Sequence, residues 1–320
     1  MTRAFDALTA EERSLLRAEP LPQHVEPMKA VLSHTPFSDP DWVFERKLDG
    51  IRCLAIARPG DATLLSRNQL SLDARFPEVA RAMEAVTDDL VADGEVVAFA
   101  GSQTSFSRLQ QRGSTHVPVF FYVFDLVHLA GYDTTALPLL ARKRLLRKVL
   151  AYRDPLRLSA YRRGSGEALL KEACRREWEG LVAKRTESIY VHGRSNDWLK
   201  LKCLGAQELV IGGYTAPHGS RTDLGALLLG YYESGKLRYA GRVGTGFTQA
   251  TLTELAGLLR PLDRARSPFA DDVRVTGATW VEPKLVAEIR FTEWTRDGRL
   301  RHPVFVGLRD DKAAVEVVRE

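Results

Sequence analysis

The sequence is poor in cysteine and methionine, with three of each in 320 residues. The cysteines, Cys53, Cys174 and Cys203, are odd in number, far apart and outside any C-x-x-C pair. This pattern predicts neither a disulfide framework nor a zinc ribbon, and we expect small buried side chains instead. There is no run of about 18 apolar residues and no apolar core of a signal peptide at the amino terminus, which favours a cytoplasmic location.

The composition is that of a folded protein, and its length favours two domains. Hydrophobic residues make up 44% and charged residues 27%. The net charge of +5 is unevenly distributed, because residues 141–203 hold 17 Lys and Arg against 7 Asp and Glu. This local excess predicts a polyanionic partner. The run RKRLLRKVL (142–150) also fits a solvated helix face, so both interpretations stay open.

Residues 1–203 have the pattern of a mixed α+β domain with mainly antiparallel strands. Thr9 and Glu12 form a capping box that predicts a short helix from residue 9, and Pro77 suits the first turn of a second helix. Apolar runs at 42–65, 90–99 and 117–129 predict strands, and amphipathic patterns at 136–152 and 166–178 predict helices. We therefore expect one domain that ends near residue 203.

Residues 204–320 have a different pattern, in which short apolar runs alternate with glycine-rich turns. Strands are expected at 208–215, 226–233, 236–243, 286–294 and 303–308, with one helix at 248–259. This spacing predicts a small β-barrel of the OB-fold type.

The string ERKLDGIRC (45–53) places a lysine among carboxylates where an apolar run begins. On its own, Lys47 would be a surface ion-pair partner of Asp49. Six further strings follow in chain order: SRN (66–68), DGE (93–95), FDL (124–126), EGLVAK (179–184), WLKLK (198–202) and RHPVFVGLRDDK (301–312). Together with K-x-D-G-x-R (47–52), they resemble the ordered motifs of the covalent nucleotidyltransferases, and among these the ATP-dependent DNA ligases.

This resemblance implies that Lys47 is the nucleophile that takes AMP from ATP. The amine attacks only when it is unprotonated, and nearby cations favour that form. Lys200 and Lys202, two residues apart on a strand, would share a face and hold one phosphate group, although lysines also protect edge strands. Gly50 would keep the nucleotide from being crowded, and Arg46 lies outside the motif as a surface residue.

The resemblance also assigns carboxylates to a metal ion. Glu179 would bind mainly Mg²⁺, for which Mn²⁺ can substitute, and Glu95 would bind ribose or metal. A Glu after Asp-Gly is otherwise an ordinary hairpin exit, which is the alternative for Glu95.

Four residues would bind the nucleoside. Phe124 would stack on adenine, although a strand aromatic is more often core, and Glu45 would accept a hydrogen bond from the adenine amino group. Arg52 and Arg67 would engage ribose and later the nick phosphate.

In the barrel, Arg309, Asp310 and Lys312 resemble the motif that orients the pyrophosphate leaving group. This role requires an open and a closed form, with a hinge near residues 202–206. In isolation the same residues would form a solvated turn. The strings GRVGTGF (241–247) and WTRDGRLRHPVF (294–305) resemble barrel domains of bacterial end-joining ligases of the ligase D type.

The resemblance as a whole implies a bacterial ATP-dependent DNA ligase of the cytosol or nucleoid that acts on nicked double-stranded DNA as a monomer. The end-binding protein Ku and separate end-processing proteins are candidate partners. Two alternatives remain at this point. One is an RNA ligase or an mRNA capping guanylyltransferase, and the other is a non-catalytic nucleic-acid-binding module that uses the basic segment and the barrel.

Overall fold

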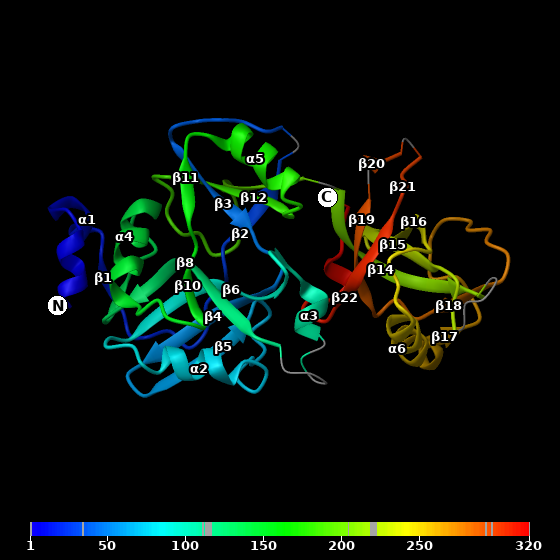
Figure 1. Cartoon of the computed structure of the whole chain (residues 1–320), viewed down its shortest axis with the longest axis horizontal. Helices are drawn as coiled ribbons and strands as arrows, with labels where there is room; N and C mark the ends of the chain where they lie inside the picture. Colours follow the sequence, from blue (N-terminus) through cyan, green and yellow to red (C-terminus); the bar gives the residue numbers. More distant parts are fainter. Residues whose placement is uncertain are drawn as a thin grey trace. The chain divides into compact units, whose positions relative to one another are not determined.

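The chain forms two compact units, Met1–Cys203 and Leu204–Glu320. The structure is a computed structural model, shown in Figure 1. It describes residues 2–33, 35–110, 112, 117–203, 205–217, 223–291, 293–295 and 297–319, without the side chains of residues 107, 205 and 206. Part of the expected hinge, Leu204 and the side chains of the two residues after it, lies outside this description.

Two sheets, one above the other in Figure 1, form the framework of the first unit. The larger has the order β1-β9-β8-β6-β4-β5, with β7 paired to β6 and β10 to β8, and the smaller has the order β11-β3-β12-β13-β2. Among the described strands of this unit only β10·β8 and β13·β2 are parallel pairs, so the predicted mixed, mainly antiparallel class is confirmed. The strands are β1 Arg17–Ala18, β2 Lys29–Leu32, β3 Trp42–Lys47, β4 Ile51–Arg58, β5 Asp61–Ser66, β6 Leu90–Ala100, β7 Gln103–Thr104, β8 Val119–Leu129, β9 Tyr132–Asp133, β10 Leu156–Leu158, β11 Tyr161–Arg163, β12 Gly180–Arg185 and β13 Arg194–Lys202.

Short helices cover the outer faces of the two sheets. The capping box at Thr9 and Glu12 is present, and Pro77 begins its helix, so both predictions are confirmed. In Figure 1, α2 lies along β4 and β5, and α5 lies along the smaller sheet. The helices are η1 Arg3–Ala7, α1 Ala10–Ser14, α2 Pro77–Met83, α3 Phe106–Gln110, α4 Leu139–Val149 and α5 Gly166–Arg175.

A buried cluster around Trp198 joins the two sheets. Trp198 on β13 packs with Leu54 on β4, Val91 on β6 and Met28. Burying such large apolar side chains stabilises a unit by about 1.5–3 kcal/mol each. The cluster therefore fixes the separation of the sheets, and the polar residues that border it face a common space.

The prediction for two of the three cysteines is wrong. Cys53 is buried and free, as expected, but Cys174 and Cys203 form a disulfide with a Cα–Cα distance of 5.1 Å. Cys174 is exposed at the end of α5, and Cys203 follows β13. Because α5 packs on β12, the neighbour of β13, the fold brings together two cysteines that are 29 residues apart in sequence.

The second unit is the predicted OB-fold barrel. Its sheet has the order β16-β15-β14-β18-β17, and β14 also pairs with β19, which pairs with β22. The long strand β14 thereby joins both halves of the barrel. The elements are β14 Gly205–Thr215, β15 Leu227–Glu233, β16 Lys236–Val243, α6 Gln249–Leu259, η3 Arg260–Leu262, β17 Asp263–Arg264, β18 Ala278–Val281, β19 Val286–Phe291, β20 Glu293–Trp294, β21 Leu300–Arg301, β22 Val304–Arg309 and η4 Ala314–Glu316. No helix in the described part of the chain is long and apolar enough to cross a bilayer.

Candidate active site

The expected nucleophile and one expected phosphate-binding lysine lie in one row of the smaller sheet. Gly180 on β12 pairs with Lys47 on β3 and with Lys202 on β13. Gly180 has φ +150, and a Cβ built there would lie 2.1 Å from the carbonyl oxygen of Leu201. Because strands lie about 4.8 Å apart, the two lysines start roughly 10 Å apart with no side chain between them. Lys47 and Lys202 therefore flank a residue without a side chain, and close approach of the Leu201 backbone explains why that residue is glycine.

The adjacent row holds two more of the predicted residues. Val182 on β12 pairs with Glu45 on β3 and with Lys200 on β13. Because side chains two residues apart on a strand share a face, Glu45 and Lys47 point to the same side, as do Lys200 and Lys202. The sheet therefore brings four predicted residues onto one face.

Lys47 is paired with a carboxylate that the sequence assigned to metal. Its Nζ lies 2.6 Å from Oε1 of Glu179, and both side chains are largely buried. Asp49 is buried as well, and its Oδ2 accepts a hydrogen bond from the backbone N of Phe106, where α3 begins. Lys47 is not the exposed surface residue that K-x-D suggests in isolation, since its side chain is largely buried and Glu179 contacts its ammonium.

Glu45 is the centre of a buried ionic cluster. Its Oε1 lies 2.6 Å from Nζ of Lys143, and Nζ of Lys184 lies 3.2 Å from both of its oxygens. The hydroxyl of Ser159 also donates to Oε2, at 3.1 Å. The carboxylate is only 2% exposed. A buried carboxylate needs such partners to remain charged, so the two lysines hold Glu45 as a fixed hydrogen-bond acceptor.

Lys184 joins this cluster to the aromatic residues. Its Nζ lies 4.2 Å from the ring centre of Phe124 and 3.9 Å from that of Trp198. Burial lowers the pKa of Lys184 to about 8, although the charge of Glu45 raises it. Stacking on two rings compensates part of the lost hydration of an ammonium.

Arg52 is held by the larger sheet. Its guanidinium donates to both oxygens of Asp93, at 2.5 and 2.6 Å, and to the carbonyl of Met28 at 3.0 Å. The hydroxyl of Tyr190 donates to Asp93 at 2.7 Å, and Arg52 Cζ lies 4.7 Å from the ring centre of Phe124. Burial alone would lower the pKa of Arg52, but the charge of Asp93 raises it above the usual range.

Glu95 and Arg67, the other predicted residues of this unit, belong to the larger sheet and its border. Glu95 on β6 pairs with Arg52 on β4 and with Tyr122 on β8, and Arg67 follows the end of β5. Among the described residues no group of three or more His, Cys, Asp or Glu side chains could hold a metal ion. Mg²⁺ usually keeps several waters and binds one or two carboxylates together with substrate phosphates. The two carboxylates of Glu95 and Glu179 would therefore be enough protein ligands for this ion.

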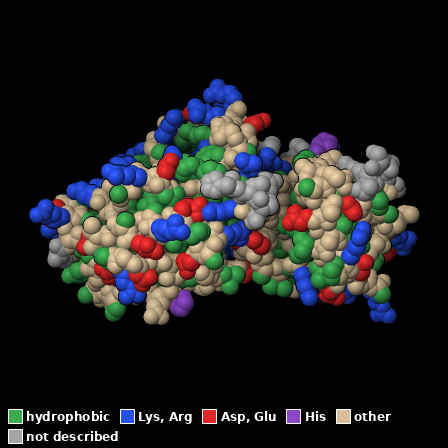
Figure 2. Space-filling view, turned by 60° about the horizontal axis from the view of Figure 1, so that its bottom comes forward, with side chains coloured by type: hydrophobic (Ala, Val, Ile, Leu, Met, Phe, Trp, Pro, Cys, Tyr) green, Lys and Arg blue, Asp and Glu red, His purple; other side chains and the backbone are tan. Residues whose placement is uncertain are grey.

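The basic segment 141–203 is less available to a polyanion than its charge suggests. Arg142 is fully buried and donates to both oxygens of Asp125, at 2.7 and 3.0 Å, and Lys143 and Lys184 are buried as well. Burial raises the pKa of Asp125, but the charge of Arg142 outweighs it and holds that pKa below its usual value. Figure 2 shows the exposed Lys and Arg side chains interspersed with Asp and Glu. Part of the positive charge of residues 141–203 is therefore used in buried ion pairs within the unit.

In the barrel, the two predicted basic residues pair with carboxylates of the same unit. Arg309 donates to Glu288 at 3.0 Å and to both oxygens of Asp311 at 2.9 and 3.0 Å. Lys312 Nζ donates to Glu208 at 3.0 Å. The side chains of Arg309 and Lys312 are only 12% and 13% exposed. We call these two residues the barrel cations. This burial of Arg309 and Lys312 does not fit a solvated turn, which was the alternative for this string in isolation.

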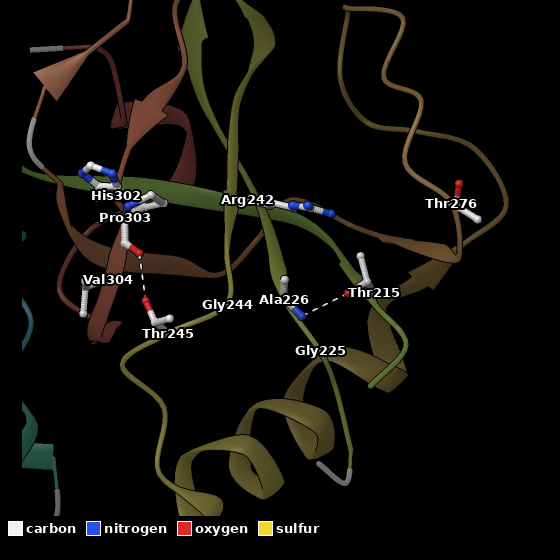
Figure 3. A pocket seen from close by; sticks show the side chains of 10 residues that line it. All are labelled: Thr215, Gly225, Ala226, Arg242, Gly244, Thr245, Thr276, His302, Pro303 and Val304. Atoms are coloured by element: carbon white, nitrogen blue, oxygen red, sulfur yellow. Dashed lines mark hydrogen bonds between the residues drawn. The ribbon is translucent and has the colours of Figure 1, made fainter. Parts of the chain in front are cut away.

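The two barrel strings come together in a pocket of about 720 Å³. Thr245 donates to the carbonyl of Pro303 at 3.1 Å, and the rings of Phe247 and Phe305 stack at 4.8 Å. Figure 3 shows Arg242 pointing toward Thr276, with His302 and Pro303 at the other end of the pocket. The lining consists of Thr215, Gly225, Ala226, Arg242, Gly244, Thr245, Thr276, His302, Pro303 and Val304. A second pocket shares Arg242 and adds Arg274 and Arg299.

Two minor expectations need correction. A Cβ at Gly50 would lie 2.3 Å from the carbonyl oxygen of Val96, so close packing of β6 already requires glycine there. Arg46 is half-buried rather than on the surface, since its Cζ lies 4.6 Å from the ring centre of Trp178. Burial lowers its pKa.

Sequence reasoning missed Lys143, Lys184 and Asp93. Lys184 ends the EGLVAK string and Asp93 begins DGE, so both motifs held a signal that was not used. Lys143 sits in a helix that resembles an ordinary basic surface helix, and no sequence signal marks its pairing with Glu45.

Comparisons with known proteins agree with this geometry. Residues 4–202 match the family described as ATP dependent DNA ligase domain, and residues 220–312 match the ATP dependent DNA ligase C terminal region. The chain is 39% identical over 316 residues to the multifunctional non-homologous end joining protein LigD of Pseudomonas aeruginosa. It is 40% identical over 288 residues to the multifunctional non-homologous end joining DNA repair protein LigD of Mycobacterium tuberculosis. These matches cover 94% and 87% of the chain but 37% of each relative.

Solved structures give the same result. The structure described as mycobacterial DNA ligase D complexed with ATP and MES has a TM-score of 0.71 at 36% identity, covering 92% of this chain and 98% of that chain. The ligase domain from M. tuberculosis LigD has a TM-score of 0.52 at 37% identity, with the same coverage. These findings favour a DNA ligase over an RNA ligase, a capping guanylyltransferase or a non-catalytic module. The chain belongs to the ATP-dependent DNA ligase family.

Proposed function

We propose that the chain seals nicks in double-stranded DNA in three transfers of a phosphoryl or nucleotidyl group. Nζ of Lys47 attacks the α-phosphorus of ATP, an N–P bond forms, and the bond to pyrophosphate breaks. The 5′-phosphate at the nick then takes the AMP from Lys47. Finally the 3′-hydroxyl loses its proton to water and attacks the phosphorus of the 5′-phosphate, the bond to AMP breaks, and a phosphodiester bond remains.

One observation carries the proposal: Lys47 and Lys202 flank Gly180 in one row of a sheet, and Glu179 contacts the nucleophile. Lys200 and Lys202 would hold the α-phosphate and stabilise the charge that develops on its oxygens. In this proposal the phosphate binds between the side chains of Lys47 and Lys202.

Glu179, with Glu95, would hold Mg²⁺, for which Mn²⁺ can substitute. Bound Mg²⁺ neutralises charge on phosphate oxygens. The ammonium of Lys47, which Glu179 contacts, would lose its proton to water before the amine attacks.

The nucleoside would bind between the two sheets. The fixed carboxylate of Glu45 accepts from the adenine amino group, Phe124 offers a ring face, and Arg52 and Arg67 contact ribose and the nick phosphate. The barrel cations would orient the pyrophosphate.

The proposal is tested by incubating the protein with [α-³²P]ATP and Mg²⁺ and then supplying a nicked duplex. Wild type should form a labelled protein, and Lys47→Ala should form none. Lys171→Ala, which changes an exposed lysine on α5, is the matched control and should label normally. Labelling of Lys47→Ala at full yield would remove Lys47 from the mechanism. Nicked DNA should be sealed in preference to nicked RNA, and ATP should label in preference to GTP.

The pocket around Arg242 is our candidate for a DNA backbone contact in the barrel. Its arginines and threonine hydroxyls suit phosphate oxygens. Arg242→Ala should weaken nicked-DNA binding and lower the slope of log K against log salt by about 1, as for one lost phosphate contact. Glu254→Gln, at an exposed position on α6, should leave the slope unchanged.

We place this activity in DNA repair, with double-strand-break joining as the specific setting, because both LigD relatives are described as non-homologous end joining proteins and that of Mycobacterium tuberculosis also as a DNA repair protein. Ku and separate end-processing proteins are then the proposed partners of a monomeric ligase in the bacterial cytosol or nucleoid. Stimulation of end joining by added Ku would support this setting, and an equal rate with and without Ku would argue for nick repair.

A further inference from the structure

Two glutamates of the barrel face each other on adjacent strands. Glu208 on β14 is the register partner of Glu288 on β19. Directly opposed residues on antiparallel strands have Cβ atoms about 5 Å apart, and like charges in such pairs destabilise a sheet. We call Glu208 and Glu288 the carboxylate pair.

The barrel cations compensate this repulsion. Lys312 donates to Glu208 and Arg309 donates to Glu288, each at 3.0 Å. The side chain of Glu288 is 7% exposed and that of Glu208 is 19% exposed, so the surrounding water screens the two charges only partly. The barrel cations therefore stabilise the charges of the carboxylate pair.

Any other anion that binds the barrel cations competes with their ion pairs to the carboxylate pair. Pyrophosphate would draw them away from the carboxylate pair and weaken the compensation of two opposed, partly buried negative charges. This costs free energy, and the cost is recovered when pyrophosphate leaves. The effect reduces the affinity for pyrophosphate without any contact between the glutamates and the ligand.

We propose that the carboxylate pair competes with pyrophosphate for the barrel cations and so promotes release of pyrophosphate after self-adenylation. Glu208 and Glu288 are thereby positioning residues. The inference rests on the proposed function, in which the barrel cations orient the leaving group.

The test is pyrophosphorolysis of the purified enzyme–AMP adduct, in which pyrophosphate attacks the phosphorus, the N–P bond breaks and ATP leaves. Glu208→Gln and Glu288→Gln should each lower the half-saturating pyrophosphate concentration by about two- to five-fold, the range for one partly exposed ion pair. Sealing of a nick that already carries AMP involves no pyrophosphate and should proceed at the wild-type rate. Glu254→Gln is the control and should match wild type in both assays.

An unchanged or raised half-saturating pyrophosphate concentration in the folded variants would overturn the inference. A purely structural role would slow pyrophosphorolysis and sealing together, without tighter pyrophosphate binding, and would overturn it as well. Glu208→Gln decides the matter if the more buried Glu288→Gln does not fold. Failure of the proposed function looks different, because wild type would then form no adduct or Lys47→Ala would still form it.

Discussion

Oε1 of Glu179 lies 2.6 Å from Nζ of Lys47, so the proposed nucleophile is paired with the carboxylate proposed to bind Mg²⁺. The contact fixes the position of the amine beside the carboxylate, so the two groups proposed for the first transfer are held in one place.

Glu179→Gln should lower the rate of labelling with [α-³²P]ATP by at least about 100-fold, because the carboxylate proposed to hold Mg²⁺ is lost, and the charge of that ion would stabilise the transferring phosphate. Rapid-quench labelling measures this rate. Glu187→Gln, a change at an exposed position in the same part of the chain, should label at the wild-type rate. Wild-type labelling of Glu179→Gln would exclude Glu179 from the reaction.

Because of Lys184, the free energy of unfolding should rise with pH in the alkaline range. Burial lowers its pKa to about 8 in the folded protein from an ordinary value of 10.5. Between these values the unfolded chain binds more protons, so the contribution of Lys184 to stability rises with pH and is least favourable below pH 8. Relative to Lys184→Met, wild type should gain on the order of 3 kcal/mol between pH 7 and 10.5.

Urea unfolding of wild type and Lys184→Met at several pH values in this range measures the difference. The same comparison with Lys171→Met, at an exposed position, should give a difference that is flat with pH. Parallel curves for wild type and Lys184→Met would show that Lys184 titrates normally.

Asp125→Asn should destabilise the first unit by about 3–5 kcal/mol, because it leaves the fully buried guanidinium of Arg142 without its counterion. Arg142 holds the pKa of Asp125 below its usual value against the opposing effect of burial. The advantage of wild type over the variant is therefore complete at neutral pH and declines as the pH falls through the lowered pKa.

Thermal unfolding at pH 7 and pH 3 measures both effects. Asp61→Asn removes the exposed partner of Arg58 and should change stability by less than about 1 kcal/mol. Equal losses in the two variants would contradict a structural role for the buried pair.

The Cys174–Cys203 disulfide should stabilise the oxidised protein. Closing a loop between cysteines 29 residues apart is worth about 3–4 kcal/mol in the chain-entropy account. Dithiothreitol should lower the melting temperature of oxidised wild type but not that of Cys174→Ser. Intact mass should show wild type lighter by two hydrogen atoms before reduction, and equal masses before and after reduction would exclude the bond.

Much of the fold was predictable because local rules decide it. The capping box at Thr9, the proline at the start of α2 and the apolar periods each act within a few residues. Alternation along a strand also predicts that Glu45 and Lys47 share a face and that Lys200 and Lys202 share a face, which needs no knowledge of the fold beyond each strand itself.

Only the tertiary structure decided which strands lie side by side and which distant side chains meet. The pairing of Lys143 with Glu45, the disulfide at Cys203 and the opposed Glu208 and Glu288 all depend on strand register and helix packing. Local periodicity determines which residues share a face, but long-range register determines which charges become neighbours. The sequence alone therefore predicted Lys47 as the nucleophile and marked the motifs around it, whereas the structure identified the counterions that contact these residues.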